Sequence, residues 1–476
     1  MRTKEMNAVF YELKENDNTA LVSATGESYT YKELAAIVRE FGSHIPERNL
    51  AFCLCENIPG CVASYVSCLN RRVVPLLLDR KIDSQLLEEL LATYMPGYVF
   101  CPDDMTDRFP EYEAVCGQIG YTLMRRVKME AIDLYPELAL LLTTSGSTGS
   151  PKLVRQSYAN IQANAEQIVE YLGIKEGDRP ITTLPMNYTY GLSIINSHLE
   201  AGATILMTEA SMGMKAFWTF FKEQNATTFG GVPFTYEMLK KLRFFRMDLP
   251  SLVYMTQAGG KLSPELHHEY AQWCRERGKD FIVMYGQAEA TARMAYLPAE
   301  YSLEKYGSMG VPIPGGSFKL MGADGAYFDE PDTVGELIYS GPNVTLGYAV
   351  CREDLAKGDE RGGILETGDM ARRDADGFYY IVGRKKRFLK IFGNRVNLDE
   401  VDRLIKTEFD GVDCASTGID DHMIIYITDM AVADDVRRWI ASTTHLSETA
   451  FTVKYLEEIP RNESGKVLYK ALSTEA

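Results

Sequence analysis

The stretch LALLLTTSGSTGSPKLV, residues 138–154, decides the fold that we expect for this chain. An apolar run at 138–142 leads directly into a loop of Thr, Ser and Gly that ends in Pro151 and Lys152. Glycine lets a backbone approach a phosphate group closely, and successive amides and hydroxyls supply donors for its oxygens. The spacing G-x-x-x-x-G-K-[ST] is absent, which excludes a Walker A loop. Composition alone also fits a flexible surface loop, but the preceding strand favours a phosphate-binding loop formed by Thr144, Ser145, Gly146, Ser147, Thr148, Gly149 and Lys152.

On both sides of this loop, short apolar runs alternate with amphipathic stretches. Residues 84–94, 215–224 and 263–278 have the apolar spacing of helices. The runs at 72–79, 97–101, 203–209, 226–232, 252–259 and 280–286 are typical of buried strands. This alternation predicts βαβ units, mainly parallel sheets and an α/β fold.

The pattern changes beyond residue 307, where short strands are broken by Gly, Pro, Asn and Asp. We expect a large N-terminal domain at 1–383, with flanking helices on mixed parallel sheets and a β-rich closing subdomain at about 307–383. After GRKKR the order strand, helix, strand, helix, strand predicts a small α+β domain at 384–476, and the family resemblance described below implies that this domain is mobile.

The composition excludes several classes of protein. The 476 residues include 50 Lys and Arg against 66 Asp and Glu, a formal net charge of −16. Proteins that coat nucleic acid or bind anionic membranes need a basic surface, so the acidic balance argues against both classes. The start of the chain lacks the apolar run of a signal peptide, and no stretch has the ~20 apolar residues of a membrane span. With nine cysteines and no complete metal-ligand spacing, we expect a cytoplasmic protein with reduced thiols.

Three further motifs carry residues suited to nucleotide chemistry. In MYGQAEATARM (284–294), Tyr285 can stack a base and Glu289 can hold a divalent cation, although this motif by itself is more typical of a polar turn after a strand. In the segment 364–387, Asp369 can accept hydrogen bonds from a ribose with Arg384 nearby, the alternative being an Asx turn. In IPRNESGKVLYKAL (459–472), a polar loop presents Lys466, which by itself fits a solvated surface residue.

Taken together, the order and spacing of these motifs resemble the ANL superfamily of adenylate-forming enzymes. The resemblance runs from about residue 25 to residue 472 and includes LPMNYTYGL (184–192), TQAGGKLS (256–263) and GELIYSGPNVTLGY (335–348). It implies two half-reactions. A carboxylate attacks the α-phosphate of ATP with Mg²⁺, giving an acyl-adenylate and pyrophosphate. A thiol then attacks the acyl carbon, and AMP leaves.

The resemblance also implies roles for individual positions. The loop from Thr144 to Lys152 would hold the β- and γ-phosphates, and Glu289 would bind Mg²⁺. Lys466 would act in catalysis on the carboxylate and ATP oxygens as charge develops. The remaining assignments are adenine binding by Gly259, Gly260 and Tyr285, nucleotide binding by Gly286, ribose binding by Asp369 and Arg384, a hinge at Lys386, and a thioester-forming loop with Lys390 and Gly393.

Two positions depart from the family pattern. Ala288 stands where the family has Thr, so one hydroxyl donor to the α-phosphate is missing unless Thr291 or a nearby amide replaces it. Tyr188 stands where an aromatic-His pair has His. No Asp or Glu lies between Arg179 and Glu200 to pair an α-amino group, which disfavours an amino acid. We expect a small carboxylic acid with no further charge, in a pocket of Tyr188, Tyr190, Gly230, Gly231 and Gln257.

The sequence leaves two alternatives for the thiol acceptor. An acyl-CoA synthetase would use CoA, whereas a stand-alone acyl or aryl ligase would load the phosphopantetheine of an acyl carrier protein. The stretch Arg384–Arg395 holds six basic residues and no acidic ones, which predicts a basic face for a phosphate-bearing thiol. A non-catalytic nucleotide-binding homologue is a remote alternative, suggested only by Ala288.

Overall fold

The structure, a computed structural model, describes residues 9–143, 152–391, 394–419, 421–444, 446–461 and 467–473. The chain divides into two compact units, one of Met1–Ser317 with Tyr339–Leu365 and one of Phe318–Ile338 with Glu366–Ala476. Strands between 318 and 338 and between 366 and 383 thus group with the C-terminal segment. The domain boundary expected at residues 383 and 384 remains a prediction.

The largest sheet of the first unit has eight strands in the order β19-β9-β8-β4-β3-β5-β7-β6. Its centre is parallel, because β3 pairs in parallel with β4 and β5, and β4 with β8. Every position of β3 is buried, as expected for a strand covered on both faces. The strands are β3 (Leu50–Cys55), β4 (Val74–Asp79), β5 (Tyr98–Pro102), β6 (Tyr112–Gln118), β7 (Tyr121–Arg126), β8 (Leu138–Thr143), β9 (Leu153–Ser157) and β19 (Gly347–Ala349).

Helices α1 (Tyr31–Ser43), α2 (Pro59–Asn70) and α3 (Ser84–Tyr94) belong to this part of the chain. Helix α3 has the bounds that its sequence predicts. The side chain of Asp83 caps its first turn by accepting from the Leu86 amide, and Met95 ends it with a left-handed φ of 44°. The residues it buries recur at helical spacing: Leu87, Leu90 and Tyr94.

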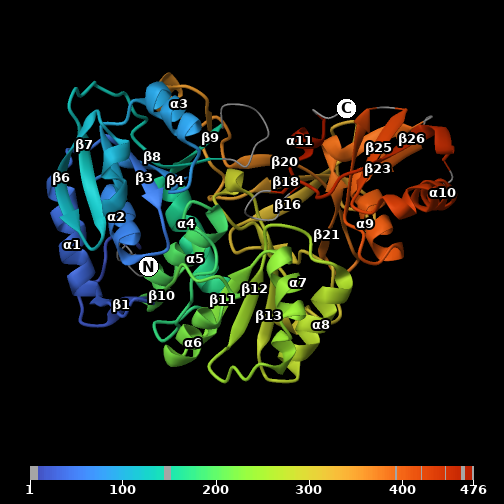
Figure 1. Cartoon of the computed structure of the whole chain (residues 1–476), viewed down its shortest axis with the longest axis horizontal. Coiled ribbons are helices and arrows are strands. Elements are labelled where there is room, and N and C mark those ends of the chain that lie inside the picture. The colour runs from blue at the N-terminus through green and yellow to red at the C-terminus, as the bar shows by residue number, and fades with distance from the viewer. Residues whose placement is uncertain are drawn as a thin grey trace, which may run out of the picture. The chain divides into compact units, whose positions relative to one another are not determined.

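The second sheet carries two of the candidate motifs. Strands β11 (Thr228–Gly231), β12 (Tyr254–Gln257) and β13 (Asp280–Tyr285) are parallel, and β14 (Ala295–Tyr296) and β15 (Val311–Pro312) continue the sheet antiparallel. Figure 1 shows helices α4 (Tyr158–Leu172) and α5 (Thr189–Ala201) between the two sheets. Ile161 and Leu192 of these helices join the core of the larger sheet, while Tyr171 and Tyr190 pack with residues of β12 and β13.

Three helices and a small sheet complete the first unit: α6 (Lys215–Glu223), α7 (Pro233–Lys241), α8 (Pro264–Arg275), and β10-β1-β2, formed by Ile205–Met207, Thr19–Ser23 and Ser28–Thr30. His267 fixes α8 to its surroundings. The Gly307 amide donates to its Nδ1 at 3.1 Å, and its Nε2 lies 3.0 Å from the Ser302 hydroxyl. Burial lowers the pKa of His267 to about 4, so the ring is neutral.

The second unit contains a five-stranded sheet in the order β17-β16-β18-β20-β21 and an α+β segment. The sheet strands are β16 (Ser317–Met321), β17 (Tyr327–Phe328), β18 (Gly335–Ser340), β20 (Ile364–Arg373) and β21 (Tyr379–Arg384). The α+β segment contains the hairpin β22 (Phe388–Ile391) and β23 (Asn394–Asn397), then α9 (Leu398–Glu408), β24 (Cys414–Ile419), β25 (His422–Ile427), α10 (Ala433–Thr444), β26 (Phe451–Tyr455) and α11 (Tyr469–Ser473).

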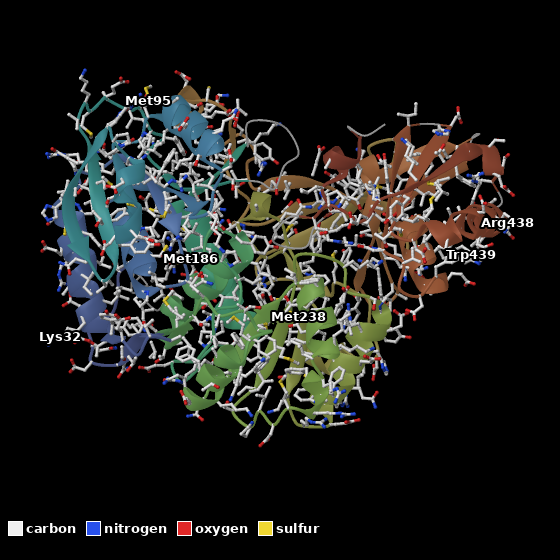
Figure 2. All side chains as sticks on the ribbon, viewed as in Figure 1. Lys32, Met95, Met186, Met238, Arg438 and Trp439 are labelled. Carbon is white, nitrogen blue, oxygen red and sulfur yellow. The ribbon has the colours of Figure 1, made fainter. Side chains whose placement is uncertain are left out.

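On the amphipathic helix α10, the neighbouring residues Arg438 and Trp439 face different surroundings. Trp439 packs edge-on against Phe409 of the preceding segment with ring centroids 5.9 Å apart. Arg438 lies at the outer edge in Figure 2, with two-thirds of its side chain exposed.

The sheets and helices of the two units together form the mixed α/β architecture that the sequence predicts. Within the described residues, no helix has the length and apolar character needed to cross a membrane.

Candidate active site

Three loops that follow parallel strands meet at one edge of the second sheet. Strands β11, β12 and β13 pair in parallel register, so their carboxyl ends are adjacent. Ligands of open α/β sheets bind just outside these ends. The structure thus brings together, at the end of β13 and on the loops after β12 and β13, the residues expected to bind the nucleotide: Gly259, Gly260, Tyr285 and Gly286.

Two of these glycines are required by close approach. A Cβ at Gly286 would lie 1.8 Å from the carbonyl oxygen of Ala292, because the segment after β13 folds back on itself. Gly259 has a φ of 86°, and a Cβ there would lie 2.5 Å from the hydroxyl of Tyr188. Both loops therefore need glycine at the positions where a nucleotide is expected.

Glu289 is held by a tyrosine that is distant in the sequence. It lies in the short turn Ala288–Ala290 and is half-buried. The Tyr348 hydroxyl donates to Glu289 Oε1 at 2.6 Å. Its Oε2 has no hydrogen-bond partner among the residues that the structure describes, which leaves one carboxylate oxygen for a ligand.

The backbone beside Glu289 is fixed by residues 343–361. The amide and the hydroxyl of Thr345 donate to the Glu289 carbonyl at 3.0 and 2.9 Å, and an Arg361 guanidinium nitrogen donates to it at 3.0 Å. Asn343, fully buried, donates to the carbonyls of Ala290 and Arg293 at 2.9 and 2.8 Å. The turn that presents Glu289 is therefore preorganised by hydrogen bonds from another part of the chain.

Lys152 approaches the same tyrosine from the phosphate loop. It immediately precedes β9, which pairs with β8 and with β19, the strand that carries Tyr348. Its Nζ lies 5.5 Å from the centroid of the Tyr348 ring, and the Arg361 guanidinium lies 4.8 Å from it. The strand expected before the loop is confirmed as β8. The loop residues themselves, Thr144, Ser145, Gly146, Ser147, Thr148 and Gly149, lie outside the described residues.

The surroundings of Tyr348 keep it protonated. Burial raises the pKa of its phenol to about 12, and the negative charge of Glu289 and the hydrogen bond to it act in the same direction. Tyr348 is therefore a permanent donor to the Glu289 carboxylate at physiological pH.

The segment after Glu289 contains a strained residue. Thr291 has φ 63° and ψ −67°, and the Ala292 amide donates to the Ala290 carbonyl at 2.7 Å, which defines a γ-turn of the rare kind. A β-branched residue in this region costs about 1–3 kcal/mol. The Thr291 hydroxyl donates to the Asn343 carbonyl at 2.7 Å, so it is not available as the donor that Ala288 lacks.

The residues expected around the acyl group also lie together. Tyr190 is buried on α5 and donates to the Thr256 carbonyl at 2.8 Å, and a Cβ at Gly230 would lie 2.8 Å from its hydroxyl. The Tyr188 ring centroid lies 6.4 Å from that of Tyr190. Gly231 ends β11. Met186, which precedes Tyr188 by two positions and is labelled in Figure 2, is buried in the core of the larger sheet.

Gln257 is the last residue of β12, before the loop that contains Gly259 and Gly260. The side chain is fully buried, and its amide nitrogen donates to the carbonyls of Ala258 and Gly260 at 3.2 and 2.9 Å. These two hydrogen bonds hold the backbone of the loop that follows β12. Its place in the acyl pocket remains a prediction.

Asp369 and Arg384 lie opposite each other in the second unit. They pair across β20 and β21, and Arg384 Nε is 2.9 Å from Asp369 Oδ1. Asp369 is buried, and its amide donates to the Thr367 hydroxyl at 3.1 Å. The two residues predicted to bind ribose are thus brought together by strand register.

The basic stretch after β21 is partly neutralised. Arg384, Lys385 and Arg387 form ion pairs with acidic residues of the second unit: Asp369, Glu336, and Asp399 with Asp402. These acids come from distant parts of the sequence, so the charge run itself did not indicate them. Lys386 lies in the turn Lys385–Arg387 and Lys390 in β22, while Gly393 and Lys466 lie outside the described residues.

Sequence reasoning missed the residues that surround Glu289. The block GPNVTLGY (341–348) belongs to the family resemblance, but the resemblance gives no role for Asn343, Thr345 or Tyr348. Arg361 and Arg293 showed no signal beyond their charge. Only the pairing of β9 with β19 and the hydrogen bonds to the 289–293 segment reveal them.

Comparisons with known proteins identify the class. Solved structures of similar fold include o-succinylbenzoate CoA synthetase from Bacillus subtilis with its acyl-adenylate intermediate, at a TM-score of 0.77, 22% identity and coverage of 96% of this chain and 95% of that one. ATP-bound MatB from Rhodopseudomonas palustris has a TM-score of 0.79, 20% identity and 99% coverage of both chains. The fold is thus that of the ANL adenylate-forming enzymes.

The family follows from the sequence. The family described as "AMP-binding enzyme" matches residues 12–349, and the chain belongs to this family. Its curated relatives include 2-succinylbenzoate–CoA ligase of Bacillus pumilus, 25% identical over 459 residues that cover 93% of this chain and 92% of the relative. Feruloyl-CoA synthase of Amycolatopsis is 27% identical over 473 residues, which cover 93% of each chain.

Proposed function

We propose that this enzyme is an acid–thiol ligase that converts a carboxylic acid into its CoA thioester through an acyl-adenylate. In the first half-reaction a carboxylate oxygen attacks the α-phosphorus of ATP and pyrophosphate leaves. In the second, the sulfur of CoA attacks the acyl carbon, its proton is released, and AMP leaves. The observation that carries the proposal is the convergence of Lys152 and Glu289 on Tyr348, beside the loop expected to hold phosphates.

The residues around Glu289 fit a magnesium ion. Mg²⁺ prefers oxygen ligands and is usually held by one or two carboxylates together with substrate phosphates. Glu289 offers one carboxylate, oriented by Tyr348 and supported by the hydrogen bonds of Thr345. When bound there, Mg²⁺ neutralises negative charge on the triphosphate. Glu289 would hold the ion, Tyr348 would keep the carboxylate in place, and Lys152 would orient the β- and γ-phosphates.

The second unit supplies the other half of the proposed mechanism. Asp369 would accept hydrogen bonds from the ribose hydroxyls, with Arg384 beside it. Lys466 would stabilise the charge that develops as the carboxylate attacks. Rotation about Lys386 would then replace Lys466 by the loop of Lys390 and Gly393 for thioester formation.

Ala288 sets an expectation for the rate of the first half-reaction. A hydroxyl donor that stabilises developing charge can contribute ~10²–10³ in rate. The Thr291 hydroxyl is bonded to Asn343, so it does not restore that contribution. Replacing Ala288 by Thr should therefore raise the rate of adenylation.

CoA is the proposed acceptor because several curated relatives of full length are named as CoA ligases. The relatives' names include aromatic acids and a short diacid, 2-succinylbenzoate, indoleacetate, ferulate and oxalate, which defines a first substrate panel. Loading of a carrier protein's phosphopantetheine is the alternative outcome of the same experiment.

The proposal is tested by measuring each half-reaction. ATP–pyrophosphate exchange across the acid panel reports adenylation, and each active acid is then offered CoA or holo carrier protein. Lys466→Ala should lose most exchange yet still transfer a supplied acyl-adenylate to the thiol. Lys386→Pro should keep exchange and lose thioester formation. Absence of acid-dependent exchange with every acid would contradict the proposal and support a non-catalytic homologue.

A further inference from the structure

Arg293 is a buried cation that has no acidic partner among the described residues. It lies four positions after Glu289, its side chain is 3% exposed, and its Nε is buried without a hydrogen-bond partner. Among the described residues, the other deeply buried arginine is Arg155, which is satisfied by Glu360 and by backbone carbonyls, including that of Tyr348 at 3.1 Å. Arg293 is therefore unusual for this chain.

Tyrosines surround the Arg293 guanidinium. Its central carbon lies 3.9 Å from the centroid of the Tyr190 ring, and its positive charge acts to lower the pKa values of Tyr171 and Tyr188. Burial raises the pKa of Tyr190 to about 12 and also raises the pKa values of Tyr171 and Tyr188. All three phenols are neutral at physiological pH, so none of them supplies a countercharge.

A stack on Tyr190 compensates only part of the cost of removing a guanidinium from water. An isolated buried charge is strongly unfavourable, whereas a carboxylate paired with Arg by two parallel hydrogen bonds satisfies both charge and geometry. Because the protein offers no such partner in the described residues, the arrangement is suited to an anion carried by a ligand.

Arg293 lies beside a residue of the expected acyl pocket, so an anion bound to it would belong to the acyl substrate. Tyr190, on which it stacks, is in contact distance of Gly230 and close to Tyr188, the residues of the expected acyl pocket. Its backbone is fixed on both sides, since its carbonyl accepts from Asn343 and Asn164 at 2.8 and 3.2 Å. The guanidinium is thus presented from a rigid segment only four residues from the proposed magnesium ligand.

We infer that Arg293 forms a subsite for a second carboxylate at the far end of the substrate, and that the enzyme activates dicarboxylic acids. This inference rests on the proposed function and replaces the sequence-based expectation of an acid with no further charge. Arg293 acts as a specificity-determining residue: it binds the carboxylate that does not react and leaves the other for adenylation.

The test compares each diacid with its own neutral counterpart. Succinate, glutarate and 2-succinylbenzoate are paired with the half-esters that retain the reacting carboxylate. A site built to bind a polar group rejects analogues that lack it strongly. We therefore expect kcat/KM in pyrophosphate exchange to favour the diacids by about 10²–10⁴ in the unaltered enzyme.

Variants of Arg293 then assign the preference. Arg293→Met keeps much of the volume, removes the charge, and should abolish the preference while half-esters stay active. Arg293→Lys keeps the charge without the planar fork and should give an intermediate ratio. Arg179→Met is the matched control, because Arg179 is half-buried and its side chain hydrogen-bonds only to Gln224 in the described residues. It should leave the ratio unchanged.

A binding measurement runs in parallel and does not depend on turnover. Calorimetric titration of diacids into the enzyme should show binding that Arg293→Met loses, whereas ATP binding without acid should stay the same. The inference is overturned if half-esters and diacids are used equally, or if Arg293→Met weakens ATP binding and leaves the acid ratio intact, which would assign Arg293 to a phosphate. Exchange with monocarboxylates alone would overturn the subsite only, whereas diacid binding without any exchange would contradict the proposed function only.

Discussion

The hydrogen bond between Tyr348 and Glu289 offers a sharp test of the proposed magnesium site. Replacing Tyr348 by Phe removes a 2.6 Å donor to a carboxylate and keeps the ring that contacts Lys152 and Arg361. A hydrogen bond to a charged group contributes about 1.5–3 kcal/mol. With 1.36 kcal/mol for each tenfold change in rate, kcat/KM for ATP should fall by about 10- to 150-fold.

The assay is pyrophosphate exchange measured against free magnesium concentration. The loss should be largest at low magnesium, because the carboxylate that holds the ion is less well oriented. Tyr327→Phe is a matched control, since Tyr327 lies on β17, is half exposed and makes no hydrogen bond to Glu289 among the described residues. A Tyr348→Phe enzyme with unchanged exchange at every magnesium concentration would refute the assigned role of this pair.

Three further predictions concern backbone, pH and ribose. Gly286→Ala places a Cβ 1.8 Å from the Ala292 carbonyl and should lower the melting temperature with a loss of about 3 kcal/mol, whereas Gly177→Ala, in open space, should not. His267 has a pKa of about 4 when folded against about 6.5 unfolded, so the unfolded chain binds more protons between these values. Stability should therefore fall by about 3 kcal/mol as pH drops from 6.5 to 4, and denaturant titrations should show a smaller fall in His267→Gln. Asp369→Asn should raise KM for ATP by about 10-fold or more with little change for the acid, and equal changes in both would contradict ribose binding.

The helices and strands of the first unit were largely predictable from the sequence. The apolar runs before Thr143 and Tyr285 match β8 and β13, and α3 has the expected bounds. Periodicity reports whether a segment buries one face or both, and these elements are strongly periodic. The same signal contains nothing about which distant strands pair, so the grouping of 318–338 with the C-terminal segment was not foreseen.

Some residues of the candidate site could likewise be predicted from the sequence, and others could not. Glu289, Asp369 and Arg384 could be predicted because each lies in a motif of the family that the sequence resembles. Tyr348 lies 59 positions from Glu289, and no local pattern links them. Arg293 has the appearance of an ordinary charged residue, and only its burial on Tyr190 distinguishes it.

The central claim, adenylation followed by transfer to CoA, is tested most directly by product analysis of a single reaction mixture. The reaction mixture contains the enzyme, Mg²⁺, ATP labelled at the α-phosphate, an active acid and CoA. After incubation, its products are separated and quantified. The proposed chemistry predicts AMP, pyrophosphate and the acyl-CoA thioester in equal amounts, with no AMP when the acid is omitted. Formation of labelled ADP, or of AMP independent of the acid, would contradict it.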